Sequence, residues 1–168
     1  MRYLLFFSVL MLVWACQSNP ESTDATTTNK STKSLEEAMP GVWETVSVRV
    51  EVNSAEGKDS SYVFEVSEET WETDLGIKPI KTYYELDNKF RSEYRGAAND
   101  TLINVNKGLW NTIGDTLMLI EPTVTYIYKV TLFNNGTGEF RSLLDWDGDG
   151  LPDDQYIGTQ RYVSKSTQ

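Results

Sequence analysis

The sequence predicts an all-β protein, an antiparallel up-and-down β-barrel of eight to nine strands. Two observations carry this prediction: apolar and polar residues alternate in short runs from Gly41 onward, and short turn signals separate those runs, with no helix of consequence between them. Short connections indicate that consecutive strands pair antiparallel. Because an open sheet of this size leaves two exposed edges, closure into a barrel is the expected solution.

The first two predicted strands lie on either side of a turn at 53–59, which contains Gly57. In the first strand, at 41–52, five valines are predicted to share one face: Val42, Val46, Val48, Val50 and Val52. The second strand covers 62–66. The less regular stretch at 68–79 predicts a longer loop with room for a short helical piece.

Three hairpins and a closing strand follow in the sequence. Strands at 80–86 and 89–95 flank Asp87-Asn88, strands at 101–113 and 116–121 flank Gly114-Asp115, and strands at 123–133 and 137–144 flank 134–136. Asn, Asp and Gly between two alternating runs are hairpin signals. The last strand is predicted at 156–163. Residues 38–165 are therefore expected to form one domain with a single core.

The N-terminal segment has the pattern of an export signal. Residues 1–15 combine Arg2 with an apolar run that is shorter than the roughly 20 residues of a membrane span and that ends in a small residue. Residues 13–16, which read VWAC, resemble a bacterial lipobox, in which the cysteine becomes the first mature residue and carries lipid. The alternative is an ordinary secretory signal with a chance cysteine at Cys16, the only cysteine of the chain.

The lipobox resemblance implies a lipoprotein of the bacterial cell envelope. Gln17 follows the cysteine, and the aspartate that retains some lipoproteins at the inner membrane is absent, so we expect an outer-membrane lipoprotein. Residues 16–37 would comprise the lipidated cysteine and a flexible tether, because the segment is rich in Ser, Thr and Asn and has almost nothing to bury. One helical turn is predicted at 35–39, before Pro40.

Composition excludes several function classes. The formal net charge is −10, with 25 acidic and 15 basic residues, which argues against nucleic acid and against electrostatic docking on anionic lipid. Contact with the membrane is therefore expected only through lipid on Cys16. The chain has no histidine, which removes the commonest general base, and no spacing suggests a catalytic pair of carboxylates. We expect a monomeric protein that is not an enzyme.

Three short features resemble the lipocalin superfamily, in the form found in lipocalin-like domains of bacterial lipoproteins. Gly41-Val42-Trp43 opens the first strand like the G-x-W motif of that family, GLW at 108–110 and GDTL at 114–117 fit its central hairpin, and Arg161 lies in the last strand. The resemblance implies a barrel that binds a small apolar molecule. It also implies that Arg161 covers Trp43 near the closed end, a cation–π contact of about 0.5–2 kcal/mol.

Aromatic residues within the predicted strands are the candidate ligand-binding residues. Inward tyrosines would give a pocket both apolar surface and hydroxyl groups, whereas the alternative is that the same rings fill the core. The candidates are Tyr62, Phe64, Tyr84, Phe90, Tyr94, Tyr126 and Tyr128.

An acidic loop at 145–154 resembles the start of a calcium loop. Asp145, Asp147 and Asp149 alternate ahead of Gly150, which permits a tight reversal. The carbonyl of Leu151 and the side chain of Asp153 would add ligands. Tyr156 stands where a bidentate acidic residue is expected, and Asp154 is the candidate substitute. The alternative is a solvated turn, so the expected cofactor is either calcium or none.

The function predicted from the sequence is therefore binding of a small hydrophobic or amphipathic molecule inside an envelope-anchored barrel. The alternative is a filled barrel whose outer surface binds a protein or glycan, with calcium ordering one loop. A cavity of about 300 Å³ or more, lined by the strand tyrosines, favours the first reading. A filled interior with an apolar patch outside favours the second.

Overall fold

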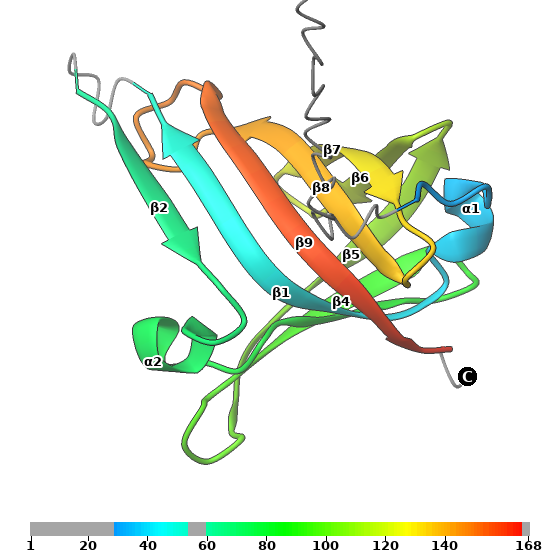
Figure 1. Ribbon diagram of the computed structural model, residues 1–168, viewed down its shortest axis with the longest axis horizontal. Coiled ribbons are helices and arrows are strands. Elements are labelled where there is room, and N and C mark those ends of the chain that lie inside the picture. The colour runs from blue at the N-terminus through cyan, green and yellow to red at the C-terminus, as the bar shows by residue number, and fades with distance from the viewer. Residues whose placement is uncertain (1–28, 54–59, 166–168) are drawn as a thin grey trace, which may run out of the picture.

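The computed structural model describes residues 29–53 and 60–165, and it confirms the all-β fold. Residues 1–15, Cys16 and most of the predicted tether lie outside the described residues. The described strands, in chain order (Figure 1), are β1 (Gly41–Val52), β2 (Tyr62–Val66), β3 (Lys81–Tyr84), β4 (Lys89–Arg95), β5 (Leu102–Ile113), β6 (Thr116–Ile120), β7 (Thr125–Leu132), β8 (Thr137–Leu144) and β9 (Asp154–Ser164). Most strand ends lie within two residues of the predicted ones.

Eight of these strands close into an up-and-down barrel. The order runs β1-β3-β4-β5-β6-β7-β8-β9, and β9 pairs back onto β1 over Val42–Glu51, so the cylinder has no open edge among these strands. β2 is an extra strand. It shares one edge of β1 with β3, because β3 pairs with Gly41–Glu44 and β2 pairs with Val48–Val52.

A β-bulge in β1 changes which residues face the interior. The register against β9 shifts between Thr45 and Ser47. Before the shift, Trp43 and Thr45 are buried, and beyond it Val48 begins the buried set. The prediction that all five valines share one face is therefore wrong ahead of the bulge, because the extra residue reverses the alternation.

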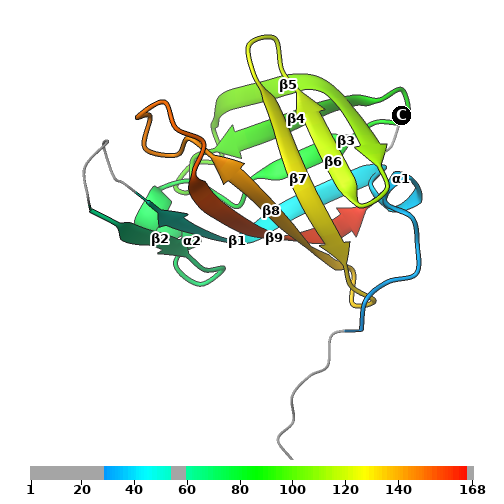
Figure 2. The ribbon, with the colours of Figure 1, turned by 90° about the horizontal axis from the view of Figure 1, so that it is seen from above.

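One end of the barrel is closed by the short helix α1 (Leu35–Ala38), which confirms the predicted turn before Pro40 (Figure 2). The hydroxyl of Ser34 caps the helix by accepting the amide of Glu37 at 3.3 Å. Leu35 and Met39 are buried against the barrel core, and the indole Nε1 of Trp43 donates to the Met39 carbonyl at 3.0 Å. The hairpins at β3–β4, β5–β6 and β7–β8 turn at this same end.

The other end of the barrel carries the longer connections. β1 ends and β2 begins here, and the connections β4–β5, β6–β7 and β8–β9 turn here, since the strands alternate in direction. The helix α2 (Trp71–Leu75), in the connection from β2 to β3, is the predicted short helical piece. Its Trp71 is buried with Val48, Val50, Val52 and Val66 in a second core cluster. We call this end the mouth.

Arg161 does not cover Trp43, which corrects the expectation drawn from the family resemblance. The residue opposite Trp43 in β9 is Tyr162, and the two rings meet edge to face with centroids 5.5 Å apart. Arg161 is one position earlier, so its side chain takes the opposite face of the sheet. There its guanidinium donates to Glu44 at 3.0 Å and to Glu68 at 2.9 Å.

The barrel is a complete unit within the described residues. All nine strands, both core clusters and the closing β1–β9 pair lie between residues 29 and 165, so residues 29–168 hold their own core and closed sheet. Among the described residues, no helix is long and apolar enough to span a membrane.

Candidate ligand-binding cavity

A cavity of about 900 Å³ occupies the barrel interior and extends to the mouth. Six of the seven predicted aromatic residues line it: Phe64, Tyr84, Phe90, Tyr94, Tyr126 and Tyr128. Tyr62 does not: it is on the same face of β2 as Phe64, but it stands at the start of the strand, where 47% of its surface is exposed. The volume is within the range of small-molecule sites, which is about 300–1,000 Å³.

Aromatic rings follow one another along the wall formed by β7, β9 and the β8–β9 loop. The ring centroids of Tyr126 and Tyr128 are 6.4 Å apart, those of Tyr128 and Tyr156 are 5.8 Å apart, and those of Tyr156 and Trp146 are 6.4 Å apart. Phe64 then contacts Trp146 at 5.3 Å. Tyr156 and Trp146 were not predicted as cavity residues, because both were considered only as parts of the acidic loop pattern.

Five neighbouring strands contribute a row of polar side chains to the same cavity. We call this row the polar belt; it consists of Gln160, Thr45, Thr82, Ser92 and Asn106, from β9, β1, β3, β4 and β5. Gln160 pairs with Thr45, Thr82 with Ser92, and Ser92 with Asn106. The hydroxyl oxygens of Thr82 and Ser92 are 2.8 Å apart. Sequence reasoning missed the belt, because polar residues in a strand ordinarily face solvent.

Two polar atoms of cavity-lining residues are buried and have no partner within the described part of the chain. They are the indole Nε1 of Trp71, a donor, and the amide Oε1 of Gln160, an acceptor. An unsatisfied buried group costs about 1–3 kcal/mol. Water or a ligand with polar atoms at the belt would therefore recover free energy that the protein alone does not.

The cavity tyrosines are held in their uncharged form. Being surrounded by protein raises the pKa of Tyr84, Tyr128 and Tyr156, and neighbouring phenols raise it further. Burial also raises the pKa of Tyr94 and Tyr126, with a smaller contribution from the charge of Glu121 at the mouth. No hydrogen bond between described residues uses these five hydroxyls, which are therefore available to a bound molecule.

These shifts predict that the barrel loses stability in alkali. Because the folded pKa of Tyr84, Tyr128 and Tyr156 lies above the unfolded value of about 10, the contribution is constant below about pH 10 and is lost as pH rises beyond it. Each such tyrosine lowers the free energy of unfolding by about 1.4 kcal/mol per pH unit in that window. Denaturant titrations at about pH 9 and about pH 11, with tyrosinate absorbance recorded in parallel, measure the loss. Full ionisation of the phenols near pH 10 in a folded barrel would contradict the prediction.

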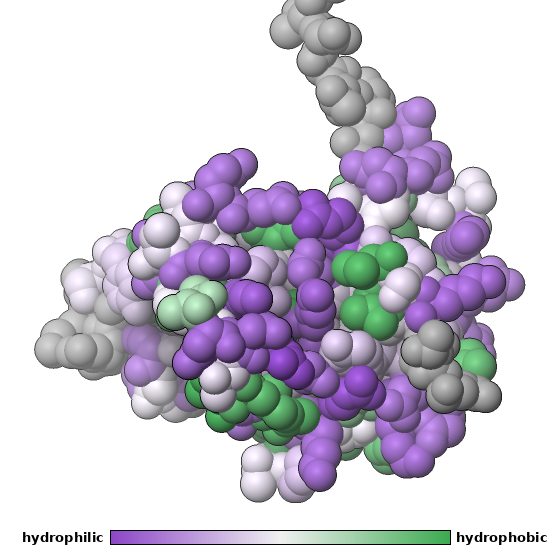
Figure 3. Space-filling model, turned by 90° about the horizontal axis from the view of Figure 1, so that it is seen from below, coloured by the Kyte–Doolittle hydropathy of each residue, from purple (hydrophilic) through white to green (hydrophobic). Residues whose placement is uncertain are grey.

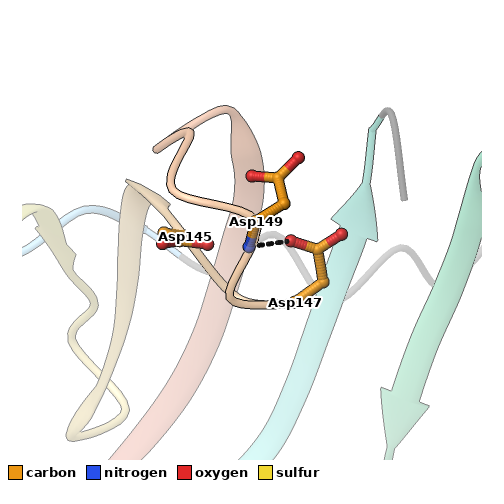
Figure 4. A group of neighbouring side chains, drawn as sticks. All are labelled: Asp145, Asp147 and Asp149. Atoms are coloured by element: carbon orange, nitrogen blue, oxygen red, sulfur yellow. Dashed lines mark hydrogen bonds between the residues drawn. The ribbon is translucent and has the colours of Figure 1, made fainter. Parts of the chain in front are cut away.

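The acidic loop brings together three of its aspartates. One carboxylate oxygen from each of Asp145, Asp147 and Asp149 lies within 4.8 Å of the others. The Asp147 carboxylate accepts the amide of Asp149 at 3.1 Å (Figure 4), and that of Asp145 accepts the amide of Gly150 at 3.0 Å. The Asp149 carboxylate accepts the amide of Leu151 at 2.8 Å, and its other oxygen is buried without a partner in the described residues.

Asp153 and Asp154 lie outside this group of three. Asp154 is fully buried, and both its oxygens accept backbone amides, Oδ1 from Asn53 at 3.0 Å and Oδ2 from Trp146 at 2.7 Å. It therefore joins the end of β1 to the acidic loop, rather than completing the ion site as the sequence suggested. The carbonyl of Asp153 accepts the side-chain amide of Asn53 at 2.9 Å.

The calcium prediction stays a prediction, and it has a direct test. If the three aspartates bind the ion, calcium at about ten times its Kd raises the free energy of unfolding of residues 29–168 by about 1.4 kcal/mol. Thermal denaturation with and without calcium measures this gain. Asp147→Asn should abolish it, whereas Asp87→Asn, in the β3–β4 turn at the closed end, should keep it. An equal gain in both variants would place the ion elsewhere.

The outer surface carries a separate apolar feature. On β5, β6 and β7, Leu109 pairs with Ile120 and Met118 pairs with Ile127, and Leu109, Ile120 and Ile127 are exposed. We call Leu109, Met118, Ile120 and Ile127 the outer strip. On the face shown in Figure 3, hydrophilic residues cover most of the surface and hydrophobic ones form separate patches. The molecule therefore has both the cavity expected of a ligand-binding barrel and the exposed apolar residues expected of a surface interaction module.

No protein-family model matches the sequence, and no curated protein is similar to it.

Proposed function

We propose that this protein binds a small hydrophobic or amphipathic molecule inside its barrel. The observation that carries the proposal is the cavity of about 900 Å³, which a barrel filled by its own side chains would lack. Its volume is about three times the smallest expected for a ligand site. The lining supports an amphipathic molecule in particular, because an aromatic wall faces the interior together with the polar belt and five tyrosine hydroxyls that have no hydrogen bond to another described residue.

Two substitutions in adjacent residues of β6 test the proposal. Leu119 lines the cavity and its neighbour Ile120 is exposed on the outer strip, so Leu119→Trp adds a ring inside the barrel and Ile120→Trp adds the same ring outside. The probe is N-phenylnaphthylamine, an uncharged apolar dye that fluoresces when it leaves water. We expect the Leu119→Trp variant of residues 29–168 to lose at least about ten-fold in affinity, a change of about 1.4 kcal/mol, while Ile120→Trp binds like the parent.

The alternative, a surface interaction module, is supported by the outer strip. Equal dye binding by the parent and both variants would place the dye outside the cavity and favour that reading. Native mass spectrometry of the gently purified protein adds an independent readout. An organic mass that leaves on mild activation, and that is missing from Leu119→Trp, supports cavity binding and gives the class of the molecule.

We further propose that the barrel is attached to the cell envelope through lipid on Cys16 and that its role is binding rather than catalysis. The export pattern of residues 1–15 supports the first part, and the absence of histidine supports the second. Mass spectrometry of the N-terminal peptide of the full chain from a bacterial host tests the anchor. Lipid on a peptide that begins at Cys16 is expected, and a peptide with an unmodified cysteine would contradict it.

A further inference from the structure

The charged residues that line the cavity are all acidic. Among the described lining residues these are Glu121, in the β6–β7 connection, and Asp145, at the start of the β8–β9 loop; no lysine or arginine lines the cavity. Lys78 and Arg95 lie near the mouth but outside the lining. Asp100 pairs with both, at 3.1 Å and 3.7 Å. An anionic group entering the cavity would therefore meet two carboxylates and no lysine or arginine among the described lining residues.

Aromatic side chains line the same cavity as these carboxylates. Glu121 is close enough to the phenols of Tyr94 and Tyr126 for its charge to add to burial in raising the pKa of both. On the other side of the mouth, Trp146 lies one residue after Asp145 and contacts Tyr156. The faces of tyrosine and tryptophan rings are the negative side of an electric quadrupole and attract cations. Carboxylates and ring faces thus favour the same sign of charge at the same end of the barrel.

Binding of a negatively charged head group is disfavoured for two reasons. A carboxylate head loses hydration on entering the cavity and finds no basic side chain among the described lining residues to replace the water. It is also repelled by the net charge of −10, which attracts cations over longer distances. Deeper in the cavity the lining is uncharged, with Tyr84 and Phe90 at the far end of the strands that carry the polar belt. This uncharged part of the lining suits an alkyl chain.

We infer that the cavity selects amphiphiles with a positively charged head group over those with a carboxylate head and the same chain. The head lies at the mouth between Glu121 and Asp145, and the tail points toward Tyr84 and Phe90. The inference rests on the proposed function, because it names the class of ligand for that same cavity.

The test compares three probes with the same alkyl chain: decyltrimethylammonium, decanol and decanoate. Each is titrated into residues 29–168 by competition with N-phenylnaphthylamine, below its micelle concentration and with a chelator present so that calcium does not mask Asp145. We expect decyltrimethylammonium to bind at least about ten-fold more tightly than decanoate, with decanol between them. Loss of this binding in Leu119→Trp, and its retention in Ile120→Trp, establishes that the probe occupies the cavity.

A charge-neutralising pair of variants then assigns the selectivity to the mouth. Glu121→Gln should weaken decyltrimethylammonium by about three- to five-fold and leave decanol unchanged. Glu139→Gln is the matched control, because Glu139 lies outside the cavity lining and pairs with Arg141. Decanoate bound as tightly as the ammonium probe would overturn the inference while the proposed function stands. Binding of all three probes that is insensitive to Leu119→Trp would overturn the proposed function itself.

Discussion

Replacing Trp43 by alanine is expected to lower the free energy of unfolding by about 3–5 kcal/mol. The side chain is 3% exposed at the closed end and meets the rings of Tyr162 and Phe140 edge to face, with centroids 5.5 Å and 6.2 Å away. Its indole N–H also donates to the carbonyl of Met39, which joins α1 to the barrel. Alanine would remove a buried ring and that connection together. Urea denaturation followed by circular dichroism measures the loss.

Two further variants separate packing from the hydrogen bond at this position. Trp43→Phe keeps a ring but loses the bond to Met39, so we expect a smaller loss, about 1–3 kcal/mol. Trp146→Ala removes the same type of side chain at the mouth, where Trp146 is 40% exposed, and should cost less than Trp43→Ala. If Trp43→Ala and Trp146→Ala cost the same, the closed end is not the main aromatic core.

Replacing Asp154 by alanine should also cost about 3–5 kcal/mol, by a different mechanism. Its two carboxylate oxygens accept the amides of Asn53 and Trp146 at 3.0 Å and 2.7 Å, in a site with no exposed surface. A hydrogen bond to a charged group contributes about 1.5–3 kcal/mol, and alanine would leave both amides without an acceptor. Thermal or urea denaturation of residues 29–168 gives the loss.

The conservative variant and an exposed neighbour give the matching comparisons for this second prediction. Asp154→Asn retains one acceptor oxygen and replaces the other with a donor, so it should lose roughly half as much stability. Asp145→Asn, at an exposed position of the same loop, should change the free energy of unfolding by less than about 0.5 kcal/mol in calcium-free buffer. Equal losses at Asp145 and Asp154 would show that the loop responds to total charge rather than to these two bonds.

The strands and their closure could be predicted from the sequence because each hairpin carries its own local signal. Asn88, for example, adopts a positive φ of 64° in the turn where Asp87-Asn88 was expected, and Gly136 does the same in the β7–β8 turn, with a φ of 80°. Asn and Gly tolerate this conformation, so the residue type marks the turn directly. Six of the aromatic residues that line the cavity could also be predicted from a local signal, because alternation places one face of each strand inside the barrel.

The features that were missed depend on register or on contacts between distant segments. The bulge in β1 is hidden by valines at every second position except Glu44, and it places Trp43 and Thr45, rather than Val46, in the buried set that continues at Val48. The partner of Trp43 is Tyr162 rather than Arg161, a difference of one residue that reverses the face. Trp71 reaches the core from a connection with no strand periodicity. None of these has a local sequence signal.

One edge of β1 is divided between β3 and β2. Part of the entrance to the cavity therefore lies outside the eight-stranded cylinder. The eight-stranded cylinder closes without β2, so β2 and α2 form a flap whose displacement breaks the β1–β2 pairing and the packing of Trp71 but no pairing of the cylinder. Phe64, Val66, Trp71 and Leu75 of this flap line the cavity. Because a partial opening of this kind costs less than global unfolding, the entrance to the cavity can widen while every strand pairing of the cylinder stays intact.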